Sequence, residues 1–161
     1  MLDNYIDFLN RVFVKIDQIG LEVSDLEIDH IAYTASSSEE YNKLSIELLK
    51  LGDLAGEDII KGRRISVINL RQALIYQNRS IPGLELIEPT LDKPTKSGLD
   101  HIEFVVPTGL SVFKDKYPAI NWNLESWNRA EYPHLKIYGL PVKFHELNIF
   151  DTIKQQRANK S

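Results

Sequence analysis

The chain of 161 residues contains no cysteine. Disulfides, thiolate metal ligands and cysteine nucleophiles are therefore excluded, and any transition-metal site must use nitrogen and oxygen ligands. Acidic and basic residues are interspersed, the formal net charge is −4, and no long basic run offers a surface for a phosphate backbone. We therefore expect no nucleic-acid partner.

The chain also lacks any apolar run that approaches the length of a transmembrane helix, so no membrane partner is expected. Its first five residues carry an acid where a secretory signal would carry positive charge before an apolar segment. A cytoplasmic protein is expected. A content of 43% hydrophobic and 26% charged residues is ordinary for a globular fold, and the length suits one domain.

Histidine is scarce as well, with four positions: His30, His101, His134 and His145. The first two lie in similar stretches, Asp-His-Ile-Ala-Tyr at 29–33 and Asp-His-Ile-Glu-Phe at 100–104, which are 71 positions apart. Each stretch predicts a short apolar strand with a histidine near its start. The repeat predicts one structural unit that is used twice.

The segments after each stretch follow the same order. In the first module, 27–88, we predict a strand at 27–34, a helix that begins at the serines 36–38 and ends at Gly52, and three extended segments. These segments are 65–70, 73–77 and 83–88, and the first two are expected to form a hairpin.

The second module, 100–147, repeats this order after a connector at 89–99 that is rich in proline and glycine. Its predicted elements are a strand at 101–106, a short helix at 110–117, and extended segments at 120–127, 135–138 and 141–145. Helices are predicted at 2–19, from its apolar stripe, and at 148–157. The sequence thus predicts a single α+β domain in which two βαβββ modules form a curved mixed sheet with a central cleft.

Strand parity selects the side chains that can face this cleft. Because alternate residues of a strand share one face, His30 lies with Ala32, and His101 lies with Glu103. The last strand of each module carries a further potential ligand, namely a glutamate at 85 or 88 in the first and His145 in the second. A single histidine at a strand start is more often hydrogen-bonded scaffold than a metal ligand.

Three features of the chain indicate a family resemblance. These are the two Asp-His-Ile stretches, the doubled βαβββ order, and the last-strand segments 84–89 (Leu-Glu-Leu-Ile-Glu-Pro) and 142–147 (Val-Lys-Phe-His-Glu-Leu). In these features the chain resembles the vicinal oxygen chelate superfamily. Glyoxalase I, methylmalonyl-CoA epimerase and the extradiol dioxygenases belong to it. Over residues 5 to 156 the chain resembles more closely the YecM-like proteins, a small bacterial branch for which metal binding is expected. The resemblance implies a glyoxalase-like fold and a metal site.

In that superfamily the ligands come from the first and fourth strands of each module, usually as two histidines and two glutamates. Carried over to this chain, they are His30, Glu85, His101 and His145, and the last departs from the usual glutamate. Glu88 is then expected to be a solvated charge. Three histidines and one carboxylate suit a divalent ion such as Zn, Ni, Mn, Fe or Co, and leave its identity open.

Other residues could serve a substrate. Glu103 is expected to point into the cleft, where it is a candidate general base, or it could form a salt bridge to Lys143 and only orient the site. Arg63 and Arg64 precede a strand and could hold a substrate carboxylate. His134 lies off the pattern and is interpreted as a surface residue.

Three classes of function follow. The first is a metalloenzyme of isomerase, lyase or epimerase type acting on an oxo- or hydroxy-acid, with an Fe(II) dioxygenase as a second enzymatic version. The second is a non-catalytic module that binds a small ligand. The third is a partner-binding protein that uses the helix at 2–19, although such apolar stripes usually face a core. Because both modules lie in one chain, a monomer suffices for the site, and a homodimer stays open.

Overall fold

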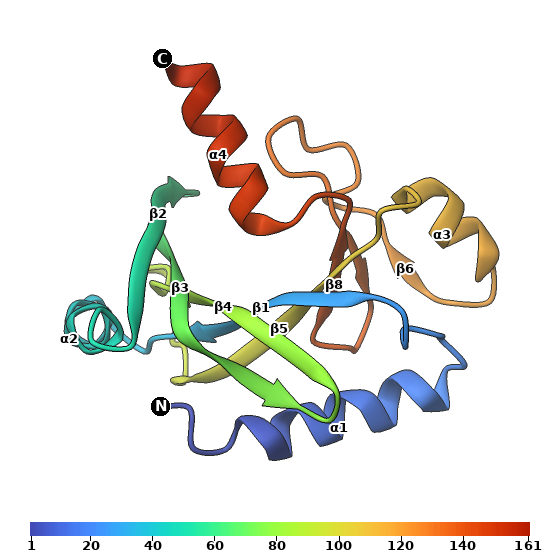
Figure 1. The fold of residues 1–161 in the computed structure, drawn as a ribbon, viewed down its shortest axis with the longest axis horizontal. Coiled ribbons are helices and arrows are strands. Elements are labelled where there is room, and N and C mark those ends of the chain that lie inside the picture. The colour runs from blue at the N-terminus through green and yellow to red at the C-terminus, as the bar shows by residue number, and fades with distance from the viewer.

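The computed structural model describes residues 1–161 and shows an α+β fold with four helices and one open, curved sheet of eight strands (Figure 1). The predicted fold class is confirmed. Helix α1 (Tyr5–Gln18) precedes two modules with the same order of elements, and helix α4 (Ile149–Lys160) follows them. No helix combines the length and the apolar character that crossing a membrane requires.

The two modules are described by their elements in chain order. The first contains β1 (Glu27–Thr34), α2 (Ser38–Leu48), β2 (Gly52–Ile60), β3 (Arg63–Tyr76) and β4 (Arg79–Ile87). The second contains β5 (Gly98–Val105), α3 (Leu110–Lys116), β6 (Trp122–Asn123), β7 (Leu135–Ile137) and β8 (Val142–His145).

The sheet has the strand order β2-β3-β4-β1-β5-β8-β7-β6. The modules meet where β1 pairs with β5 in antiparallel orientation, and each of these central strands pairs in parallel with the last strand of its own module. The sheet is therefore nearly symmetric about the β1–β5 pair. Equivalent residues of the two modules come together at its middle.

One hydrophobic core joins the sheet to the helices. Helix α1 crosses beneath β4, β1 and β5 in Figure 1, and its Leu9, Val12 and Ile16 are almost completely buried. Helix α4 projects from the opposite side, and Ile149 is its one buried side chain. The apolar stripe at the start of the chain thus faces the core, whereas α4 leaves most of its surface exposed.

The structure corrects the hairpin predicted for the first module. Residues 63–76 form the single strand β3, whose pairing with β4 shifts register between Asn69 and Leu74. Arg71, which the prediction placed in a turn, donates a hydrogen bond to Asp53 on the neighbouring strand β2. Arg71 and Gln72 resembled a turn because they are exposed and lie outside the residues of β3 that pair with β2 and β4.

The sequence pattern did not predict β2, which is an edge strand with mostly exposed side chains and therefore little alternation. Two-residue hairpin turns join β2 to β3 and β3 to β4, and the first lies between Ile60 and Arg63. Lys61 and Gly62 both have positive φ there, 52° and 77°, as a tight two-residue hairpin turn requires. Gly62 was the only sequence signal for this turn, since lysine seldom adopts that conformation.

Gly83 of β4 lies at a close approach to β1. A Cβ at this position would lie 2.6 Å from the carbonyl oxygen of Asp29 and 2.7 Å from Cβ of His30. We expect Gly83→Ala to lower the free energy of unfolding by about 1–3 kcal/mol, because β1 would have to move. Urea denaturation measures this loss. Gly98→Ala is the matched control, since a Cβ there would have no atom within 4 Å apart from those of its two chain neighbours, and an equal loss in both variants would contradict the argument.

Candidate metal centre

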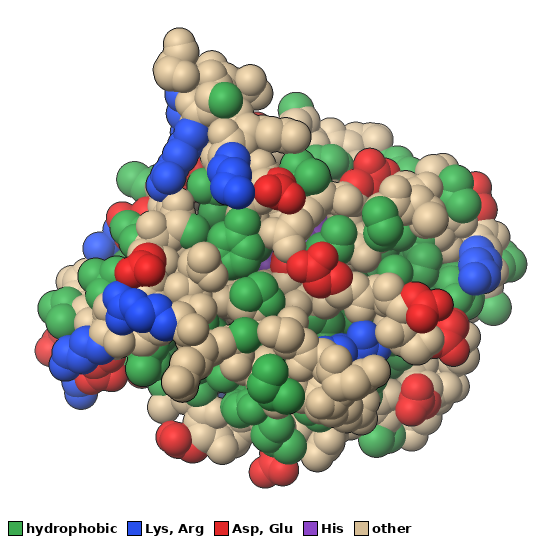
Figure 2. Space-filling view, in the orientation of Figure 1, with side chains coloured by type: hydrophobic (Ala, Val, Ile, Leu, Met, Phe, Trp, Pro, Cys, Tyr) green, Lys and Arg blue, Asp and Glu red, His purple; other side chains and the backbone are tan.

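The antiparallel pairing of β1 and β5 brings the two repeated histidines to the middle of the sheet. His30 pairs with Glu103, and His101 pairs with Ala32, so that the two imidazole centroids lie 6.4 Å apart. Both histidines are buried. Figure 2 accordingly shows only slivers of histidine on the molecular surface in that view.

Each histidine is held by the aspartate that precedes it. Neighbouring side chains of a regular strand point to opposite faces, but Asp29 and Asp100 are the extra residues at the two register shifts between β1 and β5. His30 Nδ1 donates to Asp29 at 2.8 Å, and His101 Nδ1 donates to Asp100 at 2.5 Å. Both Nε2 atoms are thereby left to face Glu85 and Glu103.

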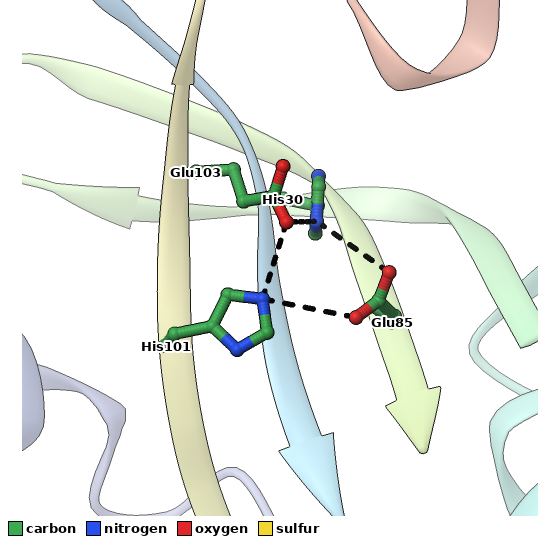
Figure 3. Close-up of side chains that lie close together, drawn as sticks. All are labelled: His30, Glu85, His101 and Glu103. Carbon is green, nitrogen blue, oxygen red and sulfur yellow. Dashed lines mark hydrogen bonds and ion pairs between the residues drawn. The ribbon is translucent and has the colours of Figure 1, made fainter. Parts of the chain in front are cut away.

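Two glutamates complete the group (Figure 3). Glu103 Oε1 lies 3.2 Å from His101 Nε2 and 3.5 Å from His30 Nε2. The two carboxylate oxygens of Glu85, on β4, each lie 3.8 Å from one of these nitrogens. The ligand atoms of His30, Glu85, His101 and Glu103, which we term the four-residue cluster, all lie within 4.8 Å of one another.

The four-residue cluster fits a divalent cation. Nitrogen and oxygen ligands about 2.0–2.2 Å from a metal lie roughly 3.0–3.6 Å from one another, which is close to the separations found here. His30 Nε2 is buried and has no hydrogen-bond partner. A buried polar atom without a hydrogen bond is unfavourable, and a cation among the four side chains would give this nitrogen a partner.

The second carboxylate comes from β5 and not from the last strand of the second module. Glu85 pairs with Ala32 across β4 and β1, and the equivalent pair across β8 and β5 is Lys143 with Glu103. The position equivalent to Glu85 is therefore a lysine, whose Nζ lies 3.5 Å from Glu103 Oε1. In the four-residue cluster, Glu103 occupies the place that the resemblance assigned to His145.

His145 lies beside the cluster and contacts its supporting residues. Its Nε2 lies 2.9 Å from Asp29 Oδ2 without the alignment of a hydrogen bond, and its Nδ1 contacts the hydroxyl of Tyr132. Asp29, His30 and His145 also form a group whose ligand atoms lie within 4.8 Å. Both oxygens of Asp29 are already hydrogen-bonded, one by His30 and the other by the backbone N–H of Ile149 at the start of α4. This second group therefore supports the histidines and is the weaker candidate for a cation.

Tyr132 is a residue that the sequence did not single out. Its hydroxyl donates to Glu103 Oε2 at 2.6 Å, so the loop between β6 and β7 reaches the cluster. His134, which was interpreted as a surface residue, is buried and donates from Nδ1 to the carbonyl oxygen of Tyr132. Burial lowers the pKa of His134 to about 4, so this histidine is neutral and acts as a support of the loop. No motif marks Tyr132 in the sequence.

The charges around the cluster favour a cation at its centre. Burial opposes ionisation of Glu103, but the positive charges of His30 and Lys143 hold its pKa well below the ordinary value. Burial also opposes protonation of His30, yet the carboxylates of Glu103 and Asp29 raise the pKa of His30 well above the ordinary value. Glu103 is thus anionic at neutral pH, and the site stabilises positive charge on His30.

The structure separates the two arginines that were expected to bind a substrate. Arg63 lines a cavity of about 330 Å³ that reaches His101. Arg64 instead donates to both carboxylate oxygens of Glu88, at 2.7 and 3.0 Å, and its guanidinium lies over the ring of Tyr41. Glu88 is a buried partner of Arg64 and not the solvated charge that was expected. The position of Arg64 gives no support to a role in substrate binding.

Sequence comparisons identify related proteins. The family model described as YecM protein matches residues 1–148. An uncharacterized protein of Haemophilus influenzae is 32% identical over 129 residues, which are 80% of this chain and 63% of that protein. The chain therefore spans less than two thirds of the length of this relative.

Solved structures share the fold. A structural-genomics protein named EC4020 superposes with a TM-score of 0.72 at 20% identity, covering 93% of this chain and 90% of its own. The hypothetical protein BH1468 of Bacillus halodurans has a TM-score of 0.53 at 15% identity, over 77% of this chain and 96% of its own. A Bacillus subtilis protein, provisionally described as a dioxygenase, has a TM-score of 0.50 at 9% identity, over 76% and 41%. At these identities the likeness concerns the fold alone.

The Arg64–Glu88 pair predicts a pH-dependent contribution to stability. Hydrogen bonds from Arg64 lower the pKa of Glu88 from 4.5 to about 2, so the pair stabilises the fold above pH 4.5 and loses this effect as the pH falls toward 2. We expect Glu88→Gln to lower the free energy of unfolding by about 1–2 kcal/mol at pH 7, and by progressively less below pH 4.5, as measured by urea denaturation. Asp53→Asn, in an exposed pair with Arg71, should have a much smaller effect. A loss for Glu88→Gln that stays constant with pH would refute the assignment.

Proposed function

Since the chain belongs to the YecM family, we propose that its four-residue cluster is a divalent-metal site of the vicinal oxygen chelate kind, which acts on a small molecule. The observation that carries the proposal is the unpartnered, buried Nε2 of His30, which faces a second imidazole and two carboxylates. The proposed ligands are His30, Glu85, His101 and Glu103. His145 is proposed to position Asp29 and Tyr132 rather than to bind the metal.

The donor set narrows the metal to a class. Two imidazoles and two carboxylates suit Zn, Ni, Mn, Fe or Co, because these ions accept mixed nitrogen and oxygen ligands. The aspartates at Nδ1 of both histidines support this assignment, since metal-ligating histidines commonly donate their other nitrogen to a carboxylate. Metal binding would also release the proton that the carboxylates stabilise on His30.

The proposed reaction is an isomerisation, epimerisation or lyase step on an oxo- or hydroxy-acid. When bound, a divalent cation supplies a Lewis acid that polarises oxygen atoms and acidifies neighbouring C–H or O–H groups. Glu103 is the group of this chain that is placed to exchange a proton. Its Oε1 faces the cluster and is the proposed ligand atom, so the proton is exchanged at Oε2, which accepts the hydrogen bond from Tyr132, and the low pKa of Glu103 keeps the carboxylate ionised. Such a weak base accepts a proton only from an acidified group.

Two other functions use the same residues. An Fe(II) oxygenase would need two histidines and one carboxylate with open positions, which His30, His101 and Glu85 supply. The Bacillus subtilis protein of similar fold, which is provisionally described as a dioxygenase, is the reason to test the oxygenase version. A non-catalytic module would bind the same small molecule without turnover. The isomerase or lyase version is preferred because the ionised Glu103 lies at the cluster.

Metal content tests the ligand set. We expect the protein to bind one equivalent of a divalent ion, measured by elemental analysis and titration, and His30→Ala and His101→Ala to lower the affinity at least about 100-fold. Glu103→Gln should lower it about 10- to 100-fold, because a ligand charge is lost. His145→Gln should keep one equivalent of metal, since His145 is outside the proposed set.

His134→Gln is the matched control for these variants, because His134 is equally buried but lies outside the cluster. Circular dichroism and thermal unfolding of every variant separate a lost ligand from a lost fold. Unchanged metal content in both His30→Ala and His101→Ala would refute the metal site.

The reaction class is tested by turnover of a panel of oxo- and hydroxy-acids by the metal-loaded protein under nitrogen and under air. We expect turnover that is independent of oxygen and falls at least about 100-fold in Glu103→Gln when metal is saturating. Turnover that requires oxygen would assign the oxygenase version instead. Tight binding of a panel member without turnover in either atmosphere would assign the non-catalytic module.

A further inference from the structure

A polar cavity of about 330 Å³ adjoins the four-residue cluster. His101 lies in its wall, and only one of its ten lining residues, Ile87, is hydrophobic. This volume is at the lower end of the range for small-molecule pockets, about 300–1,000 Å³. Such a lining disfavours an apolar occupant and favours a small, polar one.

The cavity is lined by an excess of positive charge. Its basic residues are Lys61, Arg63, Lys93 and Lys143, and its only acid is Asp100, which accepts the hydrogen bond from His101. No carboxylate lies within ion-pair distance of Lys61, Arg63 or Lys93, whereas Arg64 and Arg71 outside the cavity both form ion pairs. Arg63 Nε is also buried without a hydrogen-bond partner. Three of the four cations, Lys61, Arg63 and Lys93, therefore have no carboxylate counter-charge, and the fourth, Lys143, is paired with Glu103.

Separate parts of the fold bring these cations together. Lys61 and Arg63 flank Gly62 at the turn between β2 and β3, Lys93 lies in the connector between the modules, and Lys143 lies on β8. Two threonines of the lining, Thr34 and Thr90, add hydroxyl groups that can donate hydrogen bonds, whereas the hydroxyl of Thr95 donates to the carbonyl oxygen of Lys93. Converging guanidinium, ammonium and hydroxyl donors are the groups that recognise carboxylate and phosphate oxygens.

We propose that this cavity binds the acidic group, a carboxylate or a phosphate, of a small anionic substrate whose other end reaches the four-residue cluster. The substrate class rests on the proposed function, whereas anion binding by the cavity does not. The walls supply three unpaired cations near His101, so a substrate with a second acidic group fits better than one with an apolar tail. The proposed substrates are therefore small dicarboxylates and phosphorylated acids.

Anion binding is tested on the metal-free, chelator-treated protein, so that its outcome is independent of the metal site. Inorganic phosphate and malonate are titrated by calorimetry or by NMR, with malonamide as the neutral analogue of malonate. We expect phosphate or malonate to bind at least about 10-fold more tightly than malonamide and to weaken as salt rises. The tighter of the two probes identifies the acidic group.

Variants locate the binding. We expect Arg63→Gln and Lys61→Gln each to lower the affinity for the preferred anion about 10-fold. Lys15→Gln, which removes an exposed, unpaired lysine on α1, should leave it unchanged. Equal binding of malonate and malonamide, or equal effects of Arg63→Gln and Lys15→Gln, would overturn the proposal. If the anion binds but the metal experiments fail, the cavity is an anion site and only the proposed function is lost.

Discussion

The antiparallel pairing of β1 with β5 is the constraint on which the site depends. This pairing brings the two Asp-His-Ile stretches side by side. Its two register shifts leave Asp29 and Asp100 as the extra, unpaired residues. A bulged residue changes the direction of its side chain, so each aspartate reaches the imidazole next to it in sequence. Without these bulges the strand alternation would point each aspartate away from its histidine.

The two modules differ in where they place their glutamates. In the first module Ala32 faces Glu85 across the strand pair, and in the second Glu103 faces Lys143. Two glutamates thus reach the cluster from β4 and β5, while Lys143 places a positive charge beside Glu103 and at the wall of the basic cavity. Glu103 therefore completes the proposed ligand set, and Lys143 adds positive charge to the cavity that is proposed to bind an anion.

The fold was largely predictable because its signals are local and repeated. The two Asp-His-Ile strands, the helices after them and the final strands follow from short patterns that recur in the same order. Strand β2 and the turn at Lys61-Gly62 were missed, since an exposed edge strand carries little alternation and a lysine with positive φ gives no sequence signal. Arg71 and Gln72 suggested a turn because they are exposed and lie where the pairing of β3 with both neighbouring strands is interrupted.

The sequence by itself determined the duplication, the absence of thiolate ligands and the strand faces that carry His30, His101 and Glu103. Only the tertiary structure decided which side chains meet. Cross-strand register relates Glu85 to Lys143 and not to His145, and a loop distant in sequence brings Tyr132 to Glu103. Strand parity says which face a residue occupies, but the distance between two such residues depends on register and bulges, which are set by the packing of the whole sheet.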